Sequence, residues 1–289
     1  MEIGGWDIAA AFAKAVTYAA TLGASGAVFF TLYCGDLLRD NQRAIIRRLI
    51  LVLVIAGAAI GGLRILLLSG SMGGNPASML DASFLGMILG GGEGRATGLR
   101  IAGLLFTSFA ISSSPTFRAP AVVGAVIAAT SFAWIGHVHA LSPDIAPVLL
   151  VCLHLLCAAF WLGALAPLWV VAAGGDEPQI AAIAARFGKA ALRVVAVLLA
   201  AGAGLLWMLI SDAGQFWRSG YGYMMLAKLS AVALILSLAA WNKLSLTPKL
   251  LKRQPGAVTS FRRSVSGEIF FGALILTITA ALTTLSGPP

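Results

Sequence analysis

The stretch LILVLVIAGAAIGGLRILLL, residues 49–68, carries one charged side chain, Arg64, in an otherwise apolar run. At about 1.5 Å of rise per residue, a helix of this length crosses a hydrocarbon core about 30 Å thick. A strand of a membrane barrel would instead be short and would alternate apolar and polar residues. We therefore predict a transmembrane α-helix over this stretch.

The rest of the chain repeats this pattern. Of its 289 residues 59% are hydrophobic and 11% charged, and the mean hydropathy is +0.93, whereas soluble domains carry about 25% charged residues. Further apolar segments cover residues 8–34, 97–113, 121–139, 147–171, 190–210, 223–244 and 265–285. The segment 97–113 is the weakest, because it is short and begins beside Arg100. We expect an all-α, polytopic bundle of about eight transmembrane helices, which forms a single integral membrane domain over residues 1–289.

Lysine and arginine orient this bundle. If the N-terminus lies outside the cytoplasm, the outer connections hold only Arg95, Arg100 and Arg218, and most other basic residues face inward, as the positive-inside rule requires. Both termini are then expected on the outer side. The net charge of +9 is explained by topology, so we expect no nucleic-acid partner. The first segment lacks the basic start and the cleavage site of a signal peptide, so we expect it to be retained.

Three basic residues lie inside predicted helices rather than between them. Lys14, Arg64 and Lys228 are each within about two turns of a predicted helix end, so we expect their charged groups to reach the interface. Lys14 and Lys228 could instead line a conduit or pair with Asp7 or Asp212.

The outer connection at about 69–96 is the longest and is rich in glycine. It lacks the Gly-Lys-Ser/Thr of a phosphate-binding loop. We expect a short interfacial or re-entrant helix over 78–89, and the length of the connection favours a functional cap over a simple turn.

All three histidines of the chain fall within 18 residues, at the predicted outer ends of the segments 121–139 and 147–171. Ionisable groups at this depth are costly and usually functional, so three that can meet favour a binding site. His137 and His139 would point about 200° apart on a regular helix. Both can face one site with His154 only if the helix ends there; otherwise His139 is the bystander.

Sulfur-containing side chains gather on the same side. Every methionine after the initiator lies in the outer half, Met72 and Met79 among them, and Cys157 shares a helix face with His154. Imidazole with thioether or thiolate sulfur suits copper, Cu(I) in particular. The scarcity of carboxylates on this side disfavours magnesium and calcium. Cys157 has an alternative interpretation as an inert core residue, and each methionine as packing.

Some activities are disfavoured. The chain has no HExxH motif, no Ser–His–Asp order and no soluble module for a nucleotide, so we expect no enzyme. A b-type haem protein is an alternative, because His137 and His154 could supply one bis-histidine pair.

Several segments together resemble the bacterial copper resistance protein D (CopD) family. They are GHVHA (136–140), HLLCAAFWLGAL (154–165), RFGKAAL (186–192), YGYMMLAKLSAVALILSLAAWNKLSLTP (221–248) and FRRSVSGEIFFGALILTITAALTTLSGPP (261–289). The likeness covers about residues 131–289. The first 120 residues resemble the family only in their general apolar character. It implies a multi-pass protein of the bacterial inner membrane that handles periplasmic copper, with His137 and His154 as the natural ligands. Where the family often has an acidic residue, three positions before His154, this chain has Val151.

Two functions remain open on this basis. One is a copper permease, with an outer site of His137 and His154, assisted by His139, Met72 or Met79. The other is a metallation factor that passes copper to a periplasmic copper-binding protein or an oxidase without transport. We expect Arg262 and Arg263 to anchor the inner face, and Glu268 to form an ion pair near it.

Overall fold

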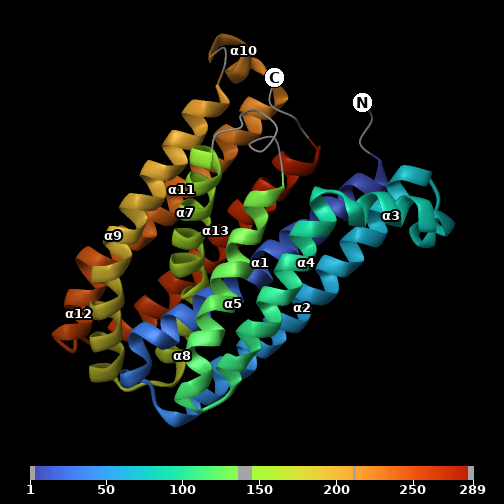
Figure 1. Ribbon diagram of the computed structural model, residues 1–289. Helices are drawn as coiled ribbons and strands as arrows, with labels where there is room; N and C mark the ends of the chain where they lie inside the picture. Colours follow the sequence, from blue (N-terminus) through green and yellow to red (C-terminus); the bar gives the residue numbers. More distant parts are fainter. Residues whose placement is uncertain (1–3, 136–144, 211–212, 286–289) are drawn as a thin grey trace.

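The computed structural model describes residues 4–135, 145–210 and 213–285, and His137 and His139 lie outside these ranges. Within them every regular element is helical (Figure 1). The α-helices are α1 (Gly5–Cys34), α2 (Asp40–Gly73), α3 (Ala82–Gly90), α4 (Gly92–Thr107), α5 (Arg118–Thr130), α7 (Ile145–Gly163), α8 (Leu165–Gly174), α9 (Glu177–Leu209), α10 (Ala213–Arg218), α11 (Gly220–Trp241), α12 (Thr247–Leu251) and α13 (Ala257–Leu285). Shorter elements include η2 (Pro76–Leu80), η3 (Ser108–Ile111), η5 (Ser131–Trp134) and the π-helical η6 (Asn242–Leu246).

The all-α, polytopic fold is confirmed. Seven helical segments among the described residues are long and apolar enough to span a membrane, and α7–α8 and α11–α12 each form one of them. The weakest predicted segment corresponds to α4, of 16 residues, continued by η3. At one end Glu93 contacts Arg64 of α2 at 2.7 Å, and at the other Ser113 contacts Arg47 at 2.9 Å. The segment therefore runs beside α2 for about 25 Å, but it is not among the seven candidate spans, so an eighth crossing stays a prediction.

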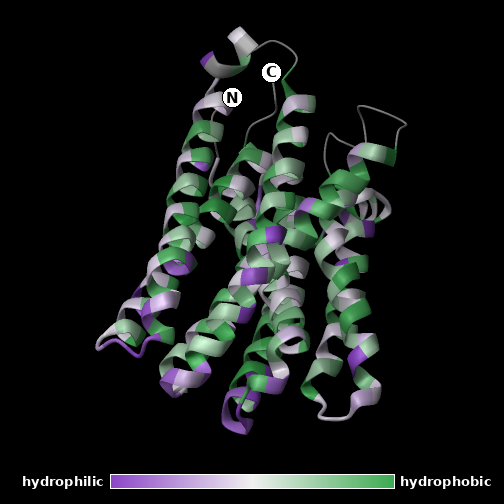
Figure 2. Ribbon diagram, turned by 90° about the vertical axis from the view of Figure 1, so that its left-hand side faces the viewer, coloured by the Kyte–Doolittle hydropathy of each residue, from purple (hydrophilic) through white to green (hydrophobic). Residues whose placement is uncertain are grey.

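The beginning of α1 and the end of α13 lie at the same end of the bundle (Figure 1), where Lys14 Nζ donates to the carbonyl of Thr283 at 3.1 Å. This arrangement is what an even number of crossings produces. Hydrophilic residues gather at the opposite end of the helices (Figure 2). We call the end with the termini the outer end, and the opposite end the inner end.

Several helices extend beyond their apolar segments at the inner end. α9 begins at Glu177 rather than near 190, because Asp176 caps it by accepting from the Gln179 N–H and Pro178 occupies its first turn. Asp176 also pairs with Arg39. The outer connection contains the expected short helix, α3, whose N-cap Asp81 accepts from the N–H groups of Ser83 and Phe84. The place of α3 in the membrane interface stays a prediction.

Charged residues are buried near the outer end, contrary to the expected position of two of them at the interface. Lys14 is 6% exposed and Arg64 is 5% exposed, because α1 and α2 turn these positions into the bundle. Arg64 donates to both carboxylate oxygens of Glu93, at 2.7 and 2.9 Å. Arg100 belongs to α4 rather than to a loop; its Nε donates to Ser131 at 3.1 Å. Lys14 and Arg100 do not contact Glu93 directly but are close enough to interact with it electrostatically.

Glycines let α1 and α7 touch backbone to backbone. A Cβ added to Gly26 would lie 2.0 Å from the carbonyl oxygen of Ala159, and one added to Gly163 would lie 2.4 Å from that of Leu22. Membrane helices associate largely by such close packing, since lipid gives no hydrophobic drive for helix association. The contact between α1 and α7 therefore depends on the absence of side chains at these two positions.

We expect Gly26→Ala to destabilise the protein by about 1–3 kcal/mol or more, because a methyl group there requires the two helices to separate. Gly62→Ala is the matched control, since nothing lies within 4 Å of its added Cβ and alanine favours helix. Thermal unfolding in detergent measures both. Equal melting temperatures for the two variants would contradict the proposed contact.

We expect Glu93→Gln to cost about 3–5 kcal/mol, because it leaves the buried guanidinium of Arg64 without a counter-charge. Asp40→Asn is the control, since the carboxylate of Asp40 is 99% exposed in its pair with Arg43 and its loss should change little. Comparison of the two unfolding free energies tests the role of the pair, and a Glu93→Gln variant as stable as the control would refute it.

Candidate functional site

His154 is the one histidine within the described residues, and it lies half-buried on α7. Its Nδ1 lies 3.2 Å from the carbonyl oxygen of Leu198 on α9. The neighbouring Gly202 makes room for the ring, because a Cβ there would be 3.1 Å from His154 Cε1. The imidazole is therefore fixed in the contact between α7 and α9.

This contact determines which ring nitrogen can bind a metal. A carbonyl oxygen only accepts hydrogen bonds, so Nδ1 of His154 must carry the proton and donate it. In the neutral ring Nε2 then holds a lone pair. Histidines that bind metals typically donate their other ring N–H in this way. With Nδ1 as the donor to Leu198, Nε2 of His154 is the ring nitrogen that could accept a proton or a metal ion.

Lys228 of α11 is close enough to interact electrostatically with His154. It is half-buried and so does not simply extend into solvent. A positive charge at this place would weaken, without preventing, the binding of a second cation to the imidazole.

The two cysteines of α7 differ in their surroundings. Cys157 is 8% exposed and belongs to the main cluster of buried apolar side chains, one turn from His154. Cys152 is only half-buried. Neither forms a disulfide in the structure.

The two candidate methionines lie on a different part of the outer end. Met72 is 47% exposed in the last turns of α2. Met79 in η2 packs with Trp6 against Gly70, where an added Cβ would lie 2.8 Å from a carbon of each. These contacts involve α1 and α2, whereas His154 contacts α9. The structure therefore does not bring the methionines into contact with His154.

The predicted partners His137 and His139 lie outside the described residues. Within residues 4–135, 145–210 and 213–285, no three side chains of the His, Cys, Asp or Glu type form a group that could hold a metal ion. Of the three expected imidazole ligands, the structure therefore describes His154 alone.

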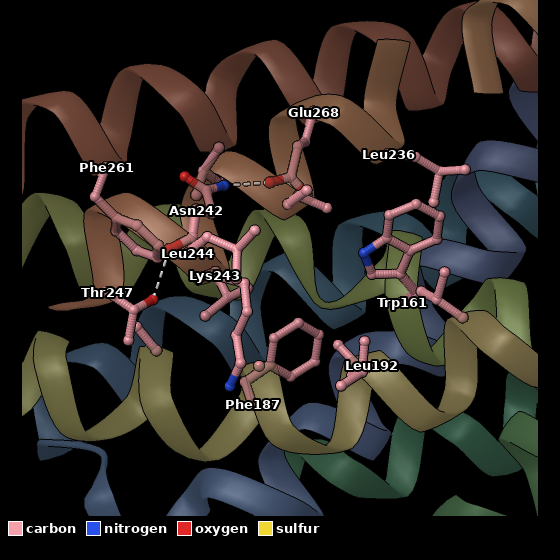
Figure 3. A pocket seen from close by; sticks show the side chains of 18 residues that line it. Trp161, Phe187, Leu192, Leu236, Asn242, Lys243, Leu244, Thr247, Phe261 and Glu268 are labelled. Atoms are coloured by element: carbon pink, nitrogen blue, oxygen red, sulfur yellow. Dashed lines mark hydrogen bonds between the residues drawn. The ribbon is translucent and has the colours of Figure 1, made fainter. Parts of the chain in front are cut away.

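A pocket of about 370 Å³ lies nearer the inner end, between α9, α11 and α13 (Figure 3). Most of its lining is apolar, and three aromatic side chains contribute to it, those of Trp161, Phe187 and Phe261. The charged residues that line it are Lys243 and Glu268. Pockets of this size and character are typical of ligand sites.

Glu268 is 4% exposed and accepts a short hydrogen bond from the Asn242 side-chain amide. The expected ion pair is wrong for the described part of the chain, because the only partner seen there is this neutral amide. Arg262 and Arg263 are exposed, so they point away from the buried carboxylate.

Asn242 opens the π-helical η6, in which the Thr247 N–H bonds to the Asn242 carbonyl five residues earlier. The Thr247 hydroxyl donates to the same carbonyl at 2.8 Å.

Pro248 follows this turn, and a proline inside a helix has no N–H and clashes with the preceding turn. That proline was the sequence signal for an irregular turn, and π-helical turns are frequent at functional sites. Sequence reasoning missed the pocket because it treated residues 223–244 as a regular helix.

Two family profiles match most of the chain. The profile described as "Copper resistance protein D-like, N-terminal domain" matches residues 6–143, and the one described as "Copper resistance protein D" matches residues 181–282. The first extends the likeness well before residue 136, where the motifs noted above begin. No curated protein and no solved structure matches this chain significantly.

The two matched regions share one core, since buried residues of α1, α2, α9 and α13 belong to a single apolar cluster. With its all-α membrane fold and these two matches, the chain belongs to the copper resistance protein D family, whose members handle copper at the membrane.

Proposed function

We propose that this protein binds Cu(I) at the outer end of the bundle and passes it inward across the bacterial inner membrane. The observation that carries the proposal is the contact that fixes the imidazole ring of His154. Its Nδ1 is held by the Leu198 carbonyl, so its Nε2 is available as a ligand in a fixed direction. Membership of a copper resistance family supports copper as the metal.

His137 is the proposed second ligand, with His139 as an auxiliary one. η5 ends at Trp134, shortly before His137, α7 begins at Ile145, and η5 packs against α7. The connection therefore starts and ends beside the helix that carries His154, and this supports a common site.

The sulfur side chains have proposed roles before and after this site. Met72 and Met79, at the outer surface, would collect the ion, since thioethers bind Cu(I). Cys157 lies one turn deeper than His154 and would be the next ligand on an inward path. Transport requires each site to release its ion, and repulsion from Lys228 would keep the affinity at His154 low enough for that.

A metallation factor for a periplasmic or oxidase partner is the second candidate. One observation favours it: beyond Cys157, the only further cysteine, histidine or methionine towards the inner end is Cys34, at the end of α1. A delivery protein needs the outer site alone and no inward path.

Copper flux separates the two candidates. We expect Cu(I) to accumulate inside sealed proteoliposomes that contain the purified protein, well above the level in empty vesicles. Copper that binds to the protein without accumulating in the lumen would favour the delivery function. An intense Soret band in the visible spectrum of the purified protein would instead indicate haem.

We expect His154→Ala to weaken Cu(I) binding by at least about tenfold, because it removes one charge-neutral nitrogen ligand of a soft-metal site. Leu153→Ala is the matched control, since Leu153 is the preceding residue on α7 and its side chain is 42% exposed. Competition with a chromogenic Cu(I) chelator measures the affinity, and melting curves check the fold. Equal affinities for the two variants would remove His154 from the site.

A further inference from the structure

The carboxylate of Glu268 has no counter-charge in the part of the chain that the structure describes. Its one hydrogen bond comes from the neutral Asn242 amide, and it forms none of the ion pairs found there. An ionised group inside the hydrocarbon zone is costly unless a charge or a ligand compensates it, and such groups are usually functional. Glu268 lines the 370 Å³ pocket, so a ligand in this pocket can supply the missing positive charge.

The pocket walls suit an organic cation better than a hydrated ion. Trp161, Phe187 and Phe261 line the space together with Glu268 (Figure 3). Aromatic faces attract ammonium groups, most strongly where water is excluded. The volume leaves room for on the order of ten non-hydrogen atoms, if each takes somewhat less space than a water molecule, about 30 Å³.

The entrance to the pocket faces the apolar surface of the bundle. Two of its lining residues, Leu192 of α9 and Leu244 of η6, are 66% and 78% exposed. Both lie within helices that are long and apolar enough to span a membrane, so we place their exposed faces against lipid. A ligand would therefore enter from the bilayer, which requires an apolar body as well as a charge.

Lys243 is the other charged residue of the lining. Its side chain extends to the α9 wall, where a Cβ on Gly188 would lie 3.4 Å from Lys243 Cδ. It makes no ion pair with Glu268, and its amino group is turned towards Phe187, away from the Glu268 carboxylate (Figure 3). A bound cation would contact Glu268 and be repelled moderately by Lys243.

We propose that this pocket binds hydrophobic organic cations, that is, molecules with an apolar body and a quaternary or protonated nitrogen. Glu268 supplies the charge that recognises the nitrogen, the aromatic side chains hold the body, and the gap at Leu192 and Leu244 admits it from the membrane. The site is separate from the proposed copper site at the outer end and does not depend on it.

Calorimetric titration of the detergent-solubilised full-length protein tests this with N-hexylpyridinium and its neutral analogue hexylbenzene. The wild-type protein should bind the cation, and Glu268→Gln should weaken that binding by about tenfold or more while binding of hexylbenzene stays unchanged. Glu177→Gln, which removes a carboxylate from an exposed position at the start of α9, is the matched control and should behave as the wild type.

Lys243→Met provides a second, independent measurement, because removal of the repelling charge should strengthen binding of the cation and not of hexylbenzene. If melting curves show that Glu268→Gln does not fold, the cation affinity of Lys243→Met tests the proposal by itself. Equal binding of cation and neutral analogue by the wild type, or an unchanged cation affinity in the folded variants, would overturn the proposal.

Discussion

Hydrocarbon offers no partner to a polar group, and this constraint explains the contacts of several buried polar side chains in the described part of the chain. Arg64 enters the bundle together with Glu93, which accepts from both of its terminal nitrogens. The Nδ1 atom of His154 contacts the Leu198 carbonyl. The Glu268 carboxylate accepts a hydrogen bond from the side-chain amide of Asn242 on the neighbouring helix. The cost of an unpaired group in lipid is several kcal/mol, so each of these contacts also fixes the position of one helix against another.

The helices meet closely because small residues occupy their contacts. Gly26 and Gly163 bring α1 against α7, and Gly103 and Gly124 do the same for α4 and α5, where each added Cβ would lie 2.5 Å from a backbone nitrogen. The α1–α7 contact joins the region matched by the N-terminal family profile to the helix that carries His154. Packing of the scaffold and placement of the candidate ligand thus depend on the same interface.

The sequence predicts where the helices lie, but it does not predict which helices pack against each other. Length and hydropathy predict each of the seven candidate spans, because the thickness of a bilayer dictates both. They do not predict which face of a helix meets another helix. For that reason Lys14 and Arg64 were assigned to the interface, although they are buried. The nearest clue was the acidic Glu93 in a glycine-rich connection. The pocket depends on a π-helical turn, and only Pro248 hinted at an irregularity in an otherwise uniform apolar run.

Gly202 has a consequence that reaches beyond this one chain. A Cβ at this position on α9 would lie 3.1 Å from Cε1 of His154, so a larger residue requires the ring to move. A homologue with a bulkier residue there has to place its imidazole elsewhere, and one that has lost the histidine is free to fill the space. The two positions should therefore vary together across related chains, and their joint variation would trace which branches keep an imidazole between α7 and α9.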